Sequence, residues 1–442
     1  MKKIVFLAFC ILPFVRILSQ NSDSSALTWS NNSHNNQIAK PDIIFDHLTE
    51  KDGLSYNHIT DILRDKHGFL WIATTFGLNR YDGNKFDIFK RNRKDSTSII
   101  HNLITAICED PMGNIWGSTE EGVFCFDKKT AKFKNYYSQD KSIYPRLHTI
   151  LCDTKSNIWA GSDMGLVKIE PKKRIFQYFR ADTADQLSIS DNRVGKRAVA
   201  LDPSKKGLWV ATNVGLNYFN FETEKFTNFH NTSDTTIFNN HRISALHIGK
   251  NGLLWMFDNT LGDLVGYETK QNKIVHRISI TNYIRNPYGG NIFETSYGQL
   301  WYSSNSYETI SVDLKNNNKI SIYKNNVANP SSITGDYVSA AWEDTDQSLW
   351  LGTVAGVSRF NINRMFYRII KLQDVYPELL NNWEITCLTQ NPKTEEWWIG
   401  SRSGKIYIFN PMTNTSRVMD ILKNTKIKMS SAFIVDSIDL LY

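Results

Sequence analysis

The stretch DKHGFLWIATTFGLNRYDG, residues 65–83, decides the fold, because its pattern recurs along the chain. An Asp and a Gly precede a Trp, and a short turn followed by Gly-Leu or Gly-Val comes after it. Further clear copies occupy residues 110–127, 206–220 and 347–361. A unit of about 47 residues cannot bury a hydrophobic core alone, so neighbouring units must stack against one another. The recurring tryptophans are Trp71, Trp116, Trp159, Trp209, Trp255, Trp301, Trp350 and Trp398.

Each repeat divides into four short apolar runs separated by turn residues. In the first repeat the runs cover residues 59–63, 69–73, 78–81 and 86–89. They are rich in Ile, Phe, Tyr and Trp, which favour β-strands, whereas the Asp and Gly between them favour tight turns. Apart from the N-terminal apolar stretch, no segment shows the long apolar period of a helix. The sequence therefore predicts an all-β fold built from four-stranded antiparallel propeller blades.

The segment IIFDHL, residues 43–48, looks like an outer strand without three inner strands of its own. It would complete the last blade, whose other strands lie within residues 338–361, and would cover both open sheet edges. We therefore predict a seven-bladed propeller over residues 43–363. Residues 364–442 are predicted to be the incomplete start of a second propeller, which stops within a ninth repeat, so we expect a fragment or a truncated gene product. A single eight-bladed ring is the alternative.

The N-terminus is typical of an exported protein. Residues 1–20 begin with two lysines and continue with a 12-residue apolar run at 4–15, which matches a secretory signal peptide and is short for a membrane span. Residues 21–42, rich in Asn and Ser, are predicted to form a flexible leader.

Composition and motifs argue against several classes of function. The net charge of +7 is small for 442 residues and the basic residues are scattered, which does not favour nucleic-acid binding. We find no GxSxG, HExxH, P-loop or dinucleotide-binding motif, so we predict no catalytic residue, no cofactor and no metal site. The cysteines outside the signal peptide are interpreted as buried thiols, although one disulfide between blades stays open: Cys108, Cys125, Cys152 and Cys387.

The recurring Trp has two interpretations. A large aromatic residue at the same place in every repeat can fill the interface between blades. A ring of sugar-stacking platforms is the alternative, but each Trp lies inside the second strand of its repeat and not on a loop. We therefore interpret these tryptophans as structural.

Candidate ligand-binding residues lie on loops that should share one face. In a propeller blade, the loop that enters the inner strand and the turn between the second and third strands lie at the same end. Amide, imidazole and aromatic groups at this end suit the hydroxyls and C–H faces of a sugar, although Asn also serves as a plain turn former. The candidates are Tyr56, Asn57, His58, Asn102, Asn192, Arg193, Asn240, His241, Asn305, Tyr307 and Trp383.

The segment GLSYNHITDILRDKHGFLWIATTFGLNRYDGNKFDIF, residues 53–89, closely resembles the two-component regulator propeller repeat. Leu-Ser-x-Asn, the Asp-x-x-Gly-x-x-Trp turn and Thr-x-x-Gly-Leu occur together and in order, and the resemblance extends over residues 43–442. It implies the periplasmic sensor part of a hybrid two-component system histidine kinase from Bacteroides-type bacteria. Such proteins resemble two seven-bladed propellers and a β-sandwich, followed by a membrane helix, a kinase, a receiver and a DNA-binding regulator.

The resemblance also implies a function. It predicts recognition of oligosaccharides released from glycans, control of carbohydrate-utilisation genes, and tethering of the full-length form to the inner membrane. The expected partners are the oligosaccharide and the protein's own C-terminal signalling domains, with a homodimer left open. The kinase residues lie outside this sequence, so this chain is not expected to be an enzyme. The alternatives are a stand-alone secreted scaffold for protein interactions and a propeller glycosidase or lyase.

Overall fold

The structure is a computed structural model, which describes residues 43–138, 146–229, 241–284, 289–305, 308–362, 385–394, 396–401, 405–410 and 415–420. The predicted signal peptide and leader lie outside these residues. The chain divides into two compact units, one spanning Ile43–Arg364 and the other comprising Met1–Asp42 with Met365–Tyr442. The described residues form β-strands and a single short 3-10 helix, η1 (Glu50–Asp52), so the predicted all-β fold of four-stranded antiparallel blades is confirmed.

The unit Ile43–Arg364 contains seven four-stranded antiparallel sheets, which we number as blades in chain order. Blades one to three comprise β2 (Ile59–Arg64), β3 (Leu70–Thr74), β4 (Gly77–Tyr81) and β5 (Phe86–Phe89); β6 (Ile104–Glu109), β7 (Ile115–Thr119), β8 (Val123–Asp127) and β9 (Lys132–Tyr136); and β10 (Leu147–Cys152), β11 (Ile158–Ser162), β12 (Gly165–Glu170) and β13 (Ile175–Phe179). Blades four to six comprise β14 (Val199–Leu201), β15 (Gly207–Thr212), β16 (Gly215–Asn220) and β17 (Lys225–Asn228); β18 (Ile243–Ile248), β19 (Leu254–Asp258), β20 (Asp263–Glu268) and β21 (Lys273–Ser279); and β22 (Asn291–Glu294), β23 (Gln299–Ser304), β24 (Glu308–Asp313) and β25 (Lys319–Tyr323). Blade seven comprises β26 (Val338–Glu343), β27 (Ser348–Thr353), β28 (Gly356–Asn361) and β1 (Asp46–Leu48).

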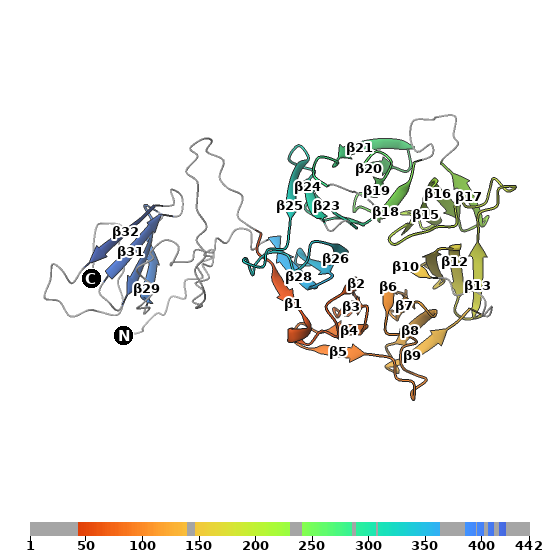
Figure 1. Cartoon of the computed structure of the whole chain (residues 1–442), viewed down its shortest axis with the longest axis horizontal. Helices are drawn as coiled ribbons and strands as arrows, with labels where there is room; N and C mark the ends of the chain where they lie inside the picture. Colours follow the sequence, from red (N-terminus) through yellow and green to blue (C-terminus); the bar gives the residue numbers. More distant parts are fainter. Residues whose placement is uncertain are drawn as a thin grey trace, which may run out of the picture. The chain divides into compact units, whose positions relative to one another are not determined.

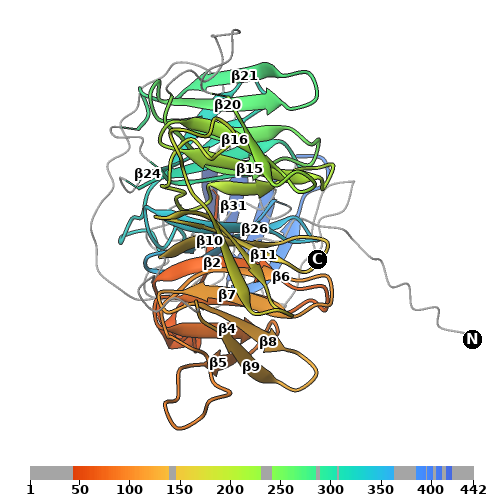
Figure 2. The same cartoon turned by 90° about the vertical axis from the view of Figure 1, so that its right-hand side faces the viewer.

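The seven sheets are arranged around a common axis (Figure 1). The inner strands contact one another in the order β2, β6, β10, β14, β18, β22 and β26, and β26 contacts β2 again. The N-terminal strand β1 pairs with β28, with Asp46 opposite Arg359 and Leu48 opposite Val357. The first segment of the unit therefore completes its last sheet. Figure 1 looks along the axis of this ring, and Figure 2 shows the same sheets from the side.

Most inner strands carry a β-bulge near their first residue. The register shifts between Ile59 and Asp61 in β2, between Ile104 and Ala106 in β6, and in the same way in β10, β18 and β26. A bulge bends a strand and redirects the side chain of the extra residue. In blade one this brings Asp61 into position to accept a hydrogen bond at 2.9 Å from the backbone N–H of Ile107, which lies on the next inner strand.

The repeated tryptophans fill the interfaces between blades. Trp71 is fully buried, and its ring centroid lies 5.2 Å from that of Phe126 in the next blade. Trp159 contacts Phe219 of blade four in the same way at 5.1 Å. The seven repeated tryptophans of this unit are each at most 7% exposed, so their faces are not free to stack on a sugar.

An Asp six or seven residues earlier holds most of these indole rings. In blade one, Asp65 accepts a hydrogen bond at 2.7 Å from Nε1 of Trp71, and its other oxygen accepts from the backbone N–H groups of His67 and Phe69. The same Asp–Trp bond is 3.0 Å long in blades two and three and 2.9 Å long in blade four. One carboxylate thus closes the turn and orients the aromatic side chain that the neighbouring blade contacts.

Blade five replaces this Asp and keeps the hydrogen bond. Gly249 stands at the position of the Asp, and Nε1 of Trp255 donates instead to Oε2 of Glu294 at 2.8 Å. Glu294 belongs to β22, the inner strand of blade six. A Cβ atom added at Gly249 would overlap the Glu294 carboxylate. The glycine therefore makes room for an acceptor that the next blade supplies.

The second unit contains an eighth sheet of the same strand order. Its strands are β29 (Ile385–Gln390), β30 (Trp397–Ser401), β31 (Lys405–Asn410) and β32 (Thr415–Asp420). Ile399, Ile406 and Phe409 are buried within this unit. That this sheet begins a second propeller stays a prediction, and the ninth repeat lies outside the described residues.

Replacing Asp65 with Ala should destabilise the protein by about 2–4 kcal/mol, because the change leaves the Trp71 indole and two backbone N–H groups without their acceptor. Burial raises the pKa of the Asp65 carboxyl. Hydrogen bonds from Lys128 and Trp71 and the charge of Lys128 together lower that pKa by more than burial raises it, so the pKa lies below its ordinary value. The stabilisation is thus present above the unfolded pKa of about 3.9 and is lost as the pH falls through the folded pKa.

Urea unfolding of wild type and Asp65→Ala at several pH values measures this difference. Asp82→Ala is the control, because Asp82 lies on the exposed turn between β4 and β5. An effect of Asp65→Ala no larger than that of Asp82→Ala would contradict the role assigned to Asp65.

Gly249→Asp and Glu294→Ala should each destabilise the protein, and the double variant should be more stable than the sum of the two losses predicts. The new Asp needs the space of the Glu294 carboxylate, and once that space is free it can accept from Trp255 as Asp65 does from Trp71. A double-mutant cycle of unfolding free energies measures the coupling, which should exceed about 1 kcal/mol. Additive losses would show that the two acceptors are not interchangeable.

Candidate functional site

The upper face of the ring is the face formed by the loops that enter the inner strands and by the turns between the second and third strands of each blade. In five blades this turn is held by a hydroxyl: in blade one, Oγ1 of Thr74 accepts from the backbone N–H of Phe76 at 3.0 Å and donates to the carbonyl of Gly77 at 2.9 Å. Thr119, Ser162, Thr212 and Thr353 make the corresponding bond to a Gly carbonyl in other blades. The repeat thus fixes a set of short turns around one end of the axis.

The structure places eight predicted ligand-binding residues on the loops and turns of this face. They are Tyr56, Asn57 and His58 before β2, Asn102 before β6, Asn192 and Arg193 before β14, His241 before β18 and Asn305 after β23. Asn240, Tyr307 and Trp383 lie outside the described residues.

Three asparagines of this set hold neighbouring backbone segments. Asn102 accepts at 2.7 Å from the backbone N–H of Arg91, and Asn192 accepts at 2.8 Å from that of Ala181. Asn57 accepts at 2.8 Å from the backbone N–H of Glu50. Their side chains hold the preceding loops in place, as the plain turn-former interpretation predicts. They shape the upper face and have less hydrogen-bonding capacity left for a ligand.

An exposed aromatic pair lies on blade one at this face. The side chains of Tyr56 and Phe76 are 45% and 46% exposed, their ring centroids are 6.3 Å apart, and the Lys90 ammonium lies 4.5 Å from the centre of the Phe76 ring. Sequence reasoning found Tyr56 but missed Phe76. The signal was available, because the turn position of Phe76 is occupied by Glu121, Met164, Val214 and Ala355 in other clear repeats.

Charged groups complete the upper face. Nδ1 of His241 lies 2.6 Å from a carboxylate oxygen of Asp258, and the Arg277 guanidinium lies 3.7 Å from the same carboxylate. Arg193 is exposed. Burial lowers the pKa of His58, and the charge of Lys196 lowers it further, so the His58 imidazole is neutral at neutral pH. Together with the aromatic pair, the upper face offers stacking surfaces, hydrogen-bond donors and hydrogen-bond acceptors.

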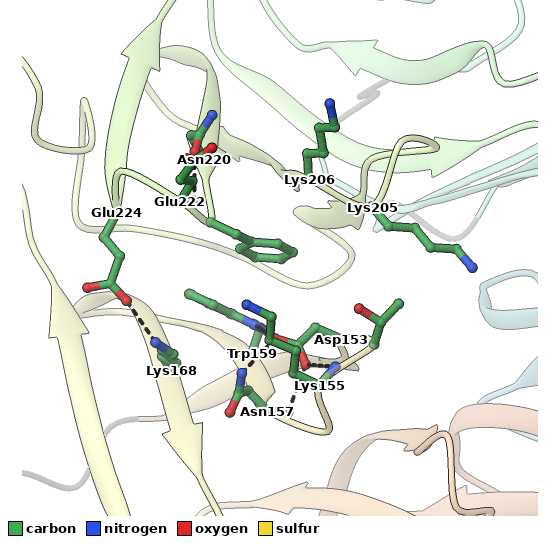
Figure 3. Close-up of a pocket in the computed structure, with 12 residues that line it drawn as sticks. Asp153, Lys155, Asn157, Trp159, Lys168, Lys205, Lys206, Asn220, Glu222 and Glu224 are labelled. Atoms are coloured by element: carbon green, nitrogen blue, oxygen red, sulfur yellow. Dashed lines mark hydrogen bonds and ion pairs between the residues drawn. The ribbon is translucent and has the colours of Figure 1, made fainter.

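A second candidate is a cleft of about 340 Å³ between blades three and four, at the opposite end of the strands (Figure 3). Trp159 and Phe221 stack at 5.2 Å in it, and Nζ of Lys168 lies 2.7 Å from Oε1 of Glu224. Asp153 is occupied by the Trp159 indole and by Asn157. Because these polar groups pair with one another, the cleft is better explained as the joint between two blades than as a ligand site.

Among the described residues, no group of three or more His, Cys, Asp and Glu side chains is placed to hold a metal ion. No helix among those residues is long and apolar enough to cross a membrane.

The cysteines left open by the sequence can now be located. Cys108 and Cys152 lie on the adjacent inner strands β6 and β10, and their sulfur atoms are 2.7 Å apart. The four described cysteines are free thiols. Burial raises the pKa of the Cys108 thiol, and the neighbouring Cys152 raises it further. Burial raises the pKa of Cys125 as well.

The family model described as "Two component regulator propeller" matches residues 53–76. Residues 53–76 thus carry one copy of this repeat. Over 56 residues it is also 48% identical to histidine kinase P4 of Formosa agariphila, a stretch that covers 13% of this chain and 4% of that protein. The resemblance to this propeller family is thus confirmed.

Solved structures share the fold. The extracellular domain of a putative hybrid two component system from B. thetaiotaomicron has a TM-score of 0.60 at 18% identity, covering 90% of this chain and 51% of that one. The corresponding domain of a putative one component system from the same organism has a TM-score of 0.55 at 16% identity, covering 85% and 47%. Streptogramin B lyase has a TM-score of 0.52 at 14% identity, covering 72% and 96%. This chain therefore spans about half the length of these two extracellular domains.

In the reduced, folded protein, iodoacetamide should alkylate Cys108 and Cys125 much more slowly than Cys387. The thiolate is the reactive form, and a raised pKa keeps both thiols protonated even near the ordinary thiol pKa of about 8.5. Mass spectrometry of tryptic peptides after timed labelling measures the rates. Labelling in urea is the control, since all cysteines should then react alike; equal rates in the folded protein would disprove the expectation.

Proposed function

We propose that this chain is the ligand-sensing region of a hybrid two-component sensor and that its upper face binds an oligosaccharide derived from a glycan. The observation that carries the proposal is the exposed Tyr56–Phe76 pair on the face where the loops of all blades meet. Sugar rings present C–H faces that stack on aromatic side chains, and an exposed aromatic pair has few other uses on a soluble surface. Both residues lie inside the segment 53–76, which matches the family model.

The proposal also covers the cellular location of the protein and its signalling partner domains. The full-length protein would be exported to the periplasm and tethered to the inner membrane, and its C-terminal signalling domains would control carbohydrate-utilisation genes. Binding on the upper face would favour one arrangement of the sensor over another. A ligand can shift such an equilibrium only by the difference between its affinities for the two states. The similarity to a histidine kinase and to extracellular domains of such systems supports this reading.

Two other functions are kept as alternatives. A propeller lyase has the same fold at 14% identity, but fold alone does not determine function. A secreted scaffold for protein interactions would use the same loops. A lyase would release products from a polysaccharide without a partner domain, whereas a sensor or a scaffold would leave the polysaccharide intact. Product analysis after incubation with the protein separates the first case from the other two.

Calorimetry of the full chain against a panel of oligosaccharides should find a binder whose affinity falls about fivefold in Tyr56→Ala and in Phe76→Ala, because one stacking contact contributes about 1 kcal/mol. Met112→Ala is the control, since Met112 is 68% exposed on the turn between β6 and β7, at the opposite end of the strands. Lys205→Ala tests the cleft between blades three and four. Absence of binding by folded protein would count against a sensor, and loss of binding only in Lys205→Ala would move the site to the cleft.

A further inference from the structure

Blade four differs from its neighbours by two extra residues at the start of its inner strand. From Ile59 to Asp65 the chain advances six positions, and blades two, three, five and seven have the same spacing, whereas from Val194 to Asp202 it advances eight. The segment Gly195-Lys196-Arg197 contains the difference. Arg197 has a φ of 57°, in the left-handed region, and β14 begins only at Val199.

Hydrogen bonds before the insertion show that the two blades are otherwise equivalent. The backbone N–H of Ser55 donates to Oδ1 of Asn79 at 2.8 Å, and that of Ser190 donates to Oδ1 of Asn217 at 3.0 Å. The two serine hydroxyls also contact the Thr hydroxyl of their own turn, at 3.1 and 2.8 Å. The loop of blade four is thus anchored like that of blade one, and only the inserted residues leave the pattern.

The insertion sends Arg197 towards the axis. Its guanidinium forms an ion pair with Asp61 of β2, although blades one and four are not neighbours in the ring. The carbonyl of Arg197 accepts from the backbone N–H of Leu246 in blade five at 2.7 Å, which fixes the turn. Asp61 is buried and also accepts from the backbone N–H groups of Ile62 and Ile107, at 2.8 and 2.9 Å. Its carboxylate is therefore fully engaged.

Lys196, next to Arg197, has no carboxylate partner among the described residues of this arrangement. In the part of the chain that the structure describes, its ammonium has neither a hydrogen-bond nor an ion-pair partner, and the residue is only partly exposed. Burial lowers its pKa to about 8, the charge of Arg197 acts in the same direction, and Asp61 opposes both. Lys196 is therefore charged in most molecules at pH 7. An unpaired cation out of bulk water is costly and gains more from a counter-ion than a surface lysine does.

The other titratable groups near the axis do not neutralise it. Burial lowers the pKa of His247, on β18, to about 4, and the charge of Arg197 contributes, so its imidazole is neutral at pH 7. His58 is neutral for the reasons given above. Lys196 and Arg197 are therefore two cations near one carboxylate, that of Asp61, which already accepts hydrogen bonds from Arg197 and from two backbone N–H groups. His58 immediately precedes β2 on the upper face and lies within electrostatic range of Lys196, which places the cations near that end of the axis.

We propose that Lys196 and Arg197 bind an anionic substituent of the saccharide, a carboxylate or a sulfate ester, at the upper end of the ring's axis. This inference rests on the proposed function and adds a ligand class to it. The ammonium offers three donors, and the guanidinium keeps donors that Asp61 does not use. Charge-assisted hydrogen bonds to such a substituent are stronger than those to a sugar hydroxyl. The aromatic pair on blade one would bind the sugar faces, and the cations would select acidic saccharides over neutral ones.

Calorimetry of the full chain with three oligosaccharides of equal length tests the inference: neutral galacto-oligosaccharide, oligogalacturonate and sulfated galacto-oligosaccharide. We expect an acidic ligand to bind more tightly than the neutral one, and the acidic ligand that binds identifies carboxylate or sulfate. Lys196→Met should weaken its binding roughly tenfold or more, as the loss of a charge-assisted hydrogen bond predicts. Lys196→Arg should retain most of the affinity. Lys273→Met, at an exposed position of β21, should leave it unchanged.

The outcomes separate this inference from the proposed function. If the neutral ligand binds as tightly as the acidic ones, or if Lys196→Met binds the acidic ligand like wild type, the axis site is wrong and the sensor proposal stands. If no oligosaccharide binds to folded protein, both fail. Should Lys196→Met not fold, the wild type still decides the question, because affinity for an acidic ligand must fall with rising ionic strength and affinity for a neutral one must not.

Discussion

The hydrogen bond between a buried indole and the carboxylate of a tight turn is the interaction on which the packing of blades one to four depends. A blade of four short strands buries little surface by itself, so each blade is stable only against its neighbours. The Asp65 carboxylate closes the turn between the first two strands of its blade and fixes the Trp71 ring that Phe126 of the next blade contacts. The same residue therefore determines both the local turn and the spacing between blades. Blade five keeps the bond with Glu294 as the acceptor where Gly249 has replaced the Asp, whereas Nε1 of Trp301 and of Trp350 has no hydrogen-bond partner among the described residues of blades six and seven.

Much of this architecture could be predicted from the sequence because its causes are local. The alternation of apolar runs with Asp and Gly turns defines the strands, and the orphan segment at residues 43–48 indicates the strand that joins blade seven. The contact between Trp255 and Glu294 could not be predicted in this way, since the two residues belong to different repeats and Gly249 stands where the common pattern has the Asp acceptor. When a residue of another repeat replaces a hydrogen-bond acceptor, the replacement can be recognised only from the three-dimensional structure.

The candidate site was predictable only in part, for the same physical reason. The loops of the upper face follow from strand order, but the roles of their side chains do not. The side chains of Asn102 and Asn192 accept hydrogen bonds from backbone N–H groups. Phe76 occupies an ordinary turn position of the repeat, but its ring is exposed. The two-residue insertion at Lys196 and Arg197 is visible in the spacing of blade four. Its direction towards Asp61 is not, because it depends on the bulges of the other inner strands.

The pairing of β1 with β28 has a mechanical consequence. Asp46 lies opposite Arg359 and Leu48 opposite Val357, so the chain enters and leaves this unit through two neighbouring antiparallel strands of one sheet. A pulling force between the two ends of the unit would load this three-residue ladder directly and would peel it apart one pair at a time. The other six sheets would carry almost none of that force. The unit can therefore stand between two anchored segments with its upper face undistorted until β1 detaches, and at that moment blade seven would lose its outer strand.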